Sequence, residues 1–128
     1  MKQLIKAATI SLGLLGLTAC NKNDAPPTSP ADGSTHTGAV NSIAQSRCQR
    51  EMRCNNIGAN RKYSSETDCL ATIQNDWKDD LSARECKNGV SQSKLDECLA
   101  KIRAEDCGNP FDTLARISAC TAGQICAN

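Results

Sequence analysis

Apolar residues recur at helical spacing along the second part of the chain. Residues 39–56 place apolar side chains three and four positions apart, which predicts an amphipathic helix. Gly58 follows this stretch and is expected to end the helix in a left-handed conformation. The inward face of this predicted helix comprises Val40, Ile43, Ala44, Cys48 and Met52.

Three further helices are predicted from their starts. Ser65 can accept a hydrogen bond from the backbone amide of Asp68, which favours a helix beginning there. A third helix is expected after Ser91, and Asn109-Pro110 provides a cap and a proline at the first position of a fourth. The inward face of the second helix is expected to comprise Cys69, Leu70, Ile73 and Trp77, and that of the third Leu95, Cys98, Leu99 and Ile102. Leu114 and Ile117 continue the fourth helix at helical spacing. No run of alternating β-branched residues occurs, so an all-α fold is predicted.

The N-terminal segment has the pattern of an export signal. Lys2 and Lys6 precede the apolar run 7–17, and small residues then lead to Cys20. A run of about 11 apolar residues is shorter than the roughly 20 that span a bilayer, so residues 1–19 are predicted to be a cleaved signal peptide. The sequence Leu-Thr-Ala-Cys at its end resembles the lipobox of bacterial lipoproteins, which implies that Cys20 is lipidated. The alternative is an ordinary signal peptide that happens to contain a cysteine.

The residues after Cys20 predict a location and a tether. Position 21 is Asn, not the Asp that marks inner-membrane retention in enteric bacteria, so the outer membrane is favoured, with the domain either periplasmic or surface-exposed. Residues 20–37 hold three prolines and many small polar residues, and they are expected to form a flexible tether that includes His36. Residues 38–128 are then the folded domain.

Export predicts the chemistry of the cysteines. Oxidising compartments favour disulfides, and an even number of cysteines remains once Cys20 is set aside. A metal or redox role is the alternative, but no C-x2-C pair is present. If the first two helices form an antiparallel hairpin, Cys54 and Cys69 would come close enough to bond. The eight cysteines are Cys48, Cys54, Cys69, Cys86, Cys98, Cys107, Cys120 and Cys126, and the predicted fold is a small disulfide-rich bundle of about four short helices.

No catalytic or cofactor motif is recognised in the sequence. His36, the one histidine, lies in the predicted tether, and neither a Gly-rich phosphate loop nor a nucleophile elbow is found. Asp76, Asp79 and Asp80 could bind a cation or act as an acid–base pair, but a solvated helix end is the favoured interpretation, because a cation such as Ca²⁺ needs six or more oxygen ligands from a shaped loop. No catalytic residue, cofactor or metal ligand is therefore predicted.

One basic patch could meet an anionic partner. Its members could contact phosphates, lipid headgroups or an acidic protein, or they could form ion pairs with Glu51, Glu66 or Asp68. Removal of the two signal-peptide lysines leaves 13 basic against 14 acidic residues, which argues against nucleic-acid binding. The patch comprises Arg47, Arg50, Arg53, Arg61 and Lys62.

Three stretches resemble a known family. They are RCQREMRCNNIGANRKY, DWKDDL at 76–81 and CGNPFDTLARISAC at 107–120. Residues 40–126 resemble cysteine-rich lipoproteins of unknown function from delta-proteobacteria such as the myxobacteria. The resemblance implies an envelope lipoprotein and supplies no activity or ligand.

The function expected from the sequence is that of a non-enzymatic binding or structural module of the cell envelope. Its partners would be the membrane, through the lipid anchor, and an envelope protein or cell-wall component. The alternative is a cation-dependent binder or hydrolase that uses Asp76, Asp79 and Asp80.

Overall fold

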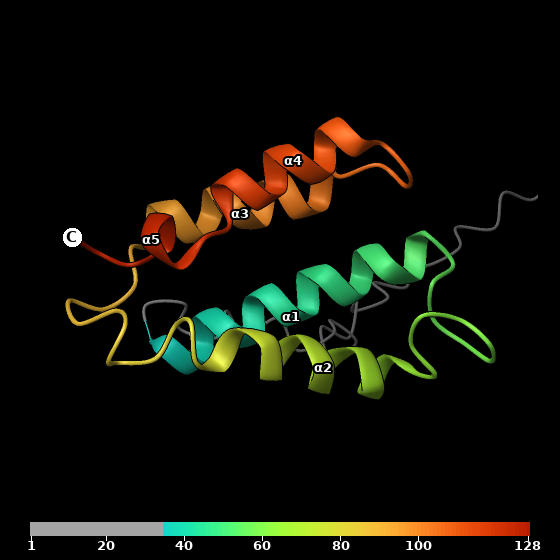
Figure 1. Ribbon diagram of the computed structural model, residues 1–128, viewed down its shortest axis with the longest axis horizontal. Helices are drawn as coiled ribbons and strands as arrows, with labels where there is room; N and C mark the ends of the chain where they lie inside the picture. The colour runs from blue at the N-terminus through green and yellow to red at the C-terminus, as the bar shows by residue number, and fades with distance from the viewer. Residues whose placement is uncertain (1–34) are drawn as a thin grey trace, which may run out of the picture.

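The computed structural model describes residues 35–128, which fold into helices joined by loops (Figure 1). The predicted all-α class is confirmed, because these residues contain no strand and only two isolated β-bridges. A short fifth helix was not predicted, since four residues are too few to show a helical period. The helices are α1 (His36–Arg53), α2 (Glu66–Lys78), α3 (Gln92–Ala104), α4 (Pro110–Ala119) and α5 (Ala122–Ile125).

The helices form two antiparallel hairpins that pack through α1 and α3 (Figure 1). One hairpin is α1 with α2, and the other is α3 with α4; α5 packs against α3 near the C-terminus. Ile43, Leu95 and Ile102 are completely buried where the hairpins meet. None of the helices within residues 35–128 has the length and apolar character needed to cross a bilayer.

Side-chain caps begin three of these helices. Ser65 Oγ accepts from the Asp68 amide at 3.1 Å, and Asn109 Oδ1 accepts from the Phe111 amide at 3.0 Å, so both predicted caps are confirmed. Thr35 caps α1 in the same way. His36, expected in the tether, is instead the first residue of α1, because the Thr35 cap starts the helix two residues before the predicted domain boundary.

The end of α1 differs from the prediction. The left-handed residue is Asn55, with φ of 55°, and not Gly58, whose φ of 134° lies outside the helical region. The Asn55 amide donates to the Met52 carbonyl and the Asn56 amide to the Glu51 carbonyl, at 3.0 and 2.9 Å. These two bonds form a Schellman motif, and asparagine tolerates its left-handed position.

Met52 was predicted to face inward, but it is 44% exposed. Glu51 is buried in its place, because the stripe that begins at Ala44 and Cys48 continues at a spacing of three to position 51. At the C-terminal end of α1, the inward-facing side chain is therefore the carboxylate of Glu51 and not the predicted thioether of Met52.

Four disulfides pair all eight cysteines of the described residues. The predicted Cys54–Cys69 pair is wrong, because the connection from 54 to 65 folds back and brings the start of α2 beside the inward-facing Cys48, with Cα atoms 5.9 Å apart. Cys54 caps α1 and bonds instead to the loop between α3 and α4. The observed pairs are Cys48–Cys69, Cys54–Cys107, Cys86–Cys126 and Cys98–Cys120.

The disulfides divide into two kinds. Cys48–Cys69 and Cys98–Cys120 each close one hairpin, with similar separations of 21 and 22 residues. Cys54–Cys107 joins the two hairpins, and Cys86–Cys126 joins the α2–α3 connection to the residue after α5. The domain is therefore cross-linked both within each hairpin and between the two hairpins.

Candidate functional site

The buried charges of the described residues gather between the two hairpins. Glu51 of α1 and Glu105, which follows α3, have side chains only 1% and 2% exposed. Arg47 and Arg50 of α1 and Arg116 of α4 surround them and are themselves mostly buried. We call these five residues the Arg–Glu cluster.

Glu105 links three helices. Its Oε2 accepts from Arg116 Nε at 2.8 Å and from Arg47 Nη1 at 3.1 Å. Its Oε1 accepts from Thr113 Oγ1 at 2.9 Å, and Arg50 Nη2 lies 3.4 Å from the same oxygen. One carboxylate at the end of α3 therefore holds both α1 and α4.

Glu51 links α1 to the loop that follows it. Its Oε1 accepts from Arg47 Nη2 at 3.3 Å and Arg50 Nη1 at 3.2 Å. Its Oε2 accepts from Asn56 Nδ2 at 2.6 Å, and Lys62 Nζ lies 3.8 Å from Oε1. The cluster is thus a structural network in which both buried carboxylates are fully paired.

The structure divides the basic patch into an inner and an outer part. Arg47 and Arg50 form the ion pairs with Glu51 that the sequence offered as one alternative. Glu66 and Asp68, the other expected partners, lie exposed in the first turn of α2. The two inner arginines are consequently engaged inside the fold.

The outer cations remain at the surface. Arg53 Nη2 donates to the Arg103 carbonyl at 3.1 Å, and Arg61 is exposed. Lys62 lies over the ring of Tyr63, with its nitrogen 5.0 Å from the ring centre. The five residues do not make a single surface for an anion.

Sequence reasoning missed Glu105, although a signal was present. Glu105 follows Ile102 by three positions and Cys98 by seven, so it continues the buried stripe of α3. Glu51 continues the stripe of α1 with the same spacing from Cys48 and Ala44. An acidic residue that extends an apolar stripe at the end of a helix marks a buried ion pair in both hairpins.

The ionisation of the cluster follows from its charges. Burial raises the pKa of Glu105, but the hydrogen bond from Thr113 and the three guanidinium groups outweigh burial, so the pKa lies below its ordinary value. Burial lowers the pKa of Arg47, and the positive charge of Arg116 lowers it further. Glu105 therefore stays ionised, and arginine keeps its proton because its ordinary pKa is so high.

Acid is expected to weaken the fold through Glu105. Because the folded pKa is below the unfolded one, the unfolded chain binds more protons, and this contribution to stability is lost as pH falls from about 4.3 through the folded value. Urea denaturation at pH 7 and pH 3 measures the loss. In Glu105→Gln this part of the pH dependence should be absent, and an unchanged pH profile in that variant would contradict the assignment.

The aspartates proposed as a cation site lie at the end of α2. Asp79 caps the helix, and Asp76 and Asp80 are exposed beside it. Among residues 35–128, no three His, Cys, Asp or Glu side chains are grouped so that they could hold a metal ion.

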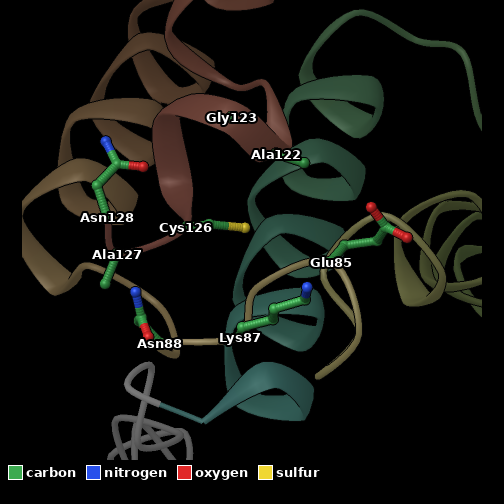
Figure 2. A pocket seen from close by; sticks show the side chains of 8 residues that line it. All are labelled: Glu85, Lys87, Asn88, Ala122, Gly123, Cys126, Ala127 and Asn128. Carbon is green, nitrogen blue, oxygen red and sulfur yellow. The ribbon is translucent and has the colours of Figure 1, made fainter.

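A shallow hollow of about 320 Å³ lies next to the C-terminus (Figure 2). Glu85 and Lys87 of the α2–α3 connection line it opposite Asn128, and Cys126 lies between them, bonded to Cys86. Its charged side chains are exposed, and its sulfur is engaged in the disulfide. These groups provide a polar surface depression.

α4 presents its apolar face to solvent. Thr113 and Arg116 point inward to Glu105, and this polar contact fixes the rotation of the helix. Phe111, Leu114 and Ile117 are left 78%, 62% and 49% exposed. We call these three residues the α4 stripe; it is a candidate interaction surface that the sequence pattern alone had not placed outside.

Comparison with known proteins identifies a family. A model described as a family of unknown function, DUF6184, matches residues 48–128. This chain belongs to the DUF6184 family. No curated protein and no solved structure matches it.

The DUF6184 match includes the main features of the domain. It begins at Cys48 and so contains all four disulfides, both buried carboxylates and the α4 stripe. The prediction that the chain belongs to a family of unknown function is confirmed. The predicted signal and Cys20 lie outside both the match and the described residues.

Proposed function

We propose that this protein is an exported, lipid-anchored binding module of the bacterial cell envelope that works without catalysis. The observation that carries the proposal is the pairing of all eight cysteines downstream of Cys20. Disulfides at this density are typical of small exported domains. The pairing also leaves Cys20 as the one cysteine of the chain that is not used in the domain.

Lipidation of Cys20 would hold the domain at a membrane. Two or more acyl chains anchor a protein stably, where one chain binds only marginally. The residue after the anchor is Asn21, which favours the outer membrane.

A binding role is supported by how the polar and apolar groups are used. The buried carboxylates of the Arg–Glu cluster are saturated by arginines that hold the helices together. The α4 stripe, in contrast, is an apolar surface that remains exposed although the hydrophobic core of the domain is small. Exposed contiguous apolar side chains mark interaction surfaces.

Expression of the full chain in an enteric bacterium tests the anchor. Wild-type protein should partition with outer-membrane detergent extracts and carry the added mass of its acyl groups, whereas Cys20→Ser should lose both. The domain should weigh about 8 Da less than its fully reduced form, because each of four bridges removes two hydrogens.

Asn21→Asp is the matched control for location. It leaves Cys20 and the domain intact, and it should move the protein from the outer to the inner membrane. Soluble wild-type protein with an unmodified N-terminus, or free thiols in the exported domain, would refute the proposal.

A further inference from the structure

The rotation of α4 is opposite to that of an ordinary surface helix. A surface helix normally turns its apolar face to the core and its polar face to water. Here Arg116 and Thr113 are held inward by Glu105, and the stripe of Phe111 and Leu114 projects outward. No residue of α4 is buried. Charge-assisted hydrogen bonds to Glu105 fix the helix in this orientation, so the fold itself holds the apolar stripe at the surface.

We propose that the α4 stripe docks onto the surface of the lipid bilayer to which the protein is anchored. The inference rests on the proposed function, since it requires the anchor at Cys20. An amphipathic helix with large apolar side chains can lie in the plane of a bilayer with that face among the headgroups and the upper acyl chains.

The size of the stripe argues against a second copy as its occupant. Three side chains with these exposures offer roughly 400 Å² of apolar surface, given the areas typical of large side chains. A stable protein–protein interface needs about 800 Å² from each partner. The stripe is therefore too small to hold a dimer by itself, but it suffices for a contact that an anchor already assists.

The length of the chain before the domain supplies that assistance. Fourteen residues lie between Cys20 and Thr35, the cap of α1, and a chain of this length can extend to at most about 50 Å. α1 itself is about 27 Å long, so a chain of this length can reach past the far end of α1. A tether of this length gives an effective concentration in the millimolar range, at which a weak docking surface is occupied.

A hollow next to the stripe continues its apolar surface. A hollow of about 410 Å³ lies beside its N-terminal end, lined by Arg50, Pro110 and Leu114 among others. Pro110 and Leu114 give the hollow an apolar edge, and Arg50 beside them is already paired with Glu51 and Glu105.

A tryptophan placed in the stripe tests the docking. The mature lipoprotein carrying Trp77→Phe and Phe111→Trp is reconstituted into vesicles of phosphatidylethanolamine and phosphatidylglycerol with brominated acyl chains, which quench tryptophan at the membrane. The matched control carries Trp77→Phe and Thr72→Trp, because Thr72 is exposed on α2, at the opposite edge of the molecule (Figure 1). Quenching at position 111 should exceed quenching at position 72 several-fold.

Leu114→Gln and Ile117→Gln added to the Phe111→Trp protein should remove the excess quenching. Both side chains are exposed, so circular dichroism and the disulfide mass should stay unchanged. Equal quenching at positions 111 and 72 would overturn the docking. A tryptophan 111 emission that depends on protein density and not on lipid bromination would overturn it in favour of a second copy.

Vesicle flotation separates this inference from the anchor. Protein that floats with vesicles without excess quenching at position 111 refutes docking and leaves the proposed function standing. Wild-type protein that does not float refutes the anchor, and the docking inference fails with it.

Discussion

Complete reduction of the four disulfides is expected to unfold residues 35–128 at 25 °C. Each bridge typically contributes about 2–4 kcal/mol, largely by restricting the unfolded chain, while a whole domain is stable by only about 5–15 kcal/mol. The core is small, and Ile43, Leu81, Leu95, Ile102 and Ile125 are the large aliphatic side chains that are completely buried in it. Far-UV circular dichroism during titration with a phosphine reductant measures the loss of helix.

One bridge can be removed to separate its contribution. Cys54–Cys107 closes the longest loop, with a separation of 53 residues, and it joins the two hairpins. Cys54→Ala with Cys107→Ala should lower the free energy of unfolding by about 4 kcal/mol. For the complete reduction, the control is wild-type protein treated with the alkylating agent but without reductant, and its far-UV circular dichroism spectrum should stay unchanged. A fully reduced domain that kept its helical signal and a cooperative urea transition would show that the core alone suffices.

Glu105→Ala is expected to lower the free energy of unfolding by about 3–5 kcal/mol, because it leaves buried arginines without their countercharge. The loss should be larger than for an ordinary surface ion pair, since the Glu105 side chain is only 2% exposed. Urea denaturation at pH 7 measures the difference from wild type. We also expect α4 to unfold in this variant, because Arg116 and Thr113 of α4 both donate hydrogen bonds to the Glu105 carboxylate.

Glu97→Ala is the matched control for this substitution. Glu97 lies on the exposed face of α3, 3.5 Å from Lys94, and both side chains are more than half exposed. Such pairs contribute little, so the expected change is within about 0.5 kcal/mol. Glu105→Gln keeps the shape of the side chain and should still destabilise, which assigns the effect to charge. Equal losses in the 97 and 105 variants would contradict a structural role for the cluster.

Local chemistry already determined where α2 and α4 begin. Ser65 and Asn109 cap their helices as predicted because capping involves only neighbouring residues. The buried stripe of α3, which includes Leu95, Cys98 and Ile102, follows from helical spacing alone. The eight domain cysteines were predicted to form bridges from their even number and from the export signal, and the structure pairs all of them.

What the sequence left open depends on how one helix lies against another. The partner of Cys54 is Cys107, because the folded-back loop sets the register of α1 against α2, and that register is a long-range property. The outward rotation of α4 depends on Glu105, which continues the buried stripe of α3 but whose contacts with Thr113 and Arg116 form only when α3 and α4 pack together. Local sequence thus determined where helices begin and which faces are amphipathic, whereas packing between hairpins decided the cysteine pairs and turned the apolar face of α4 to the outside.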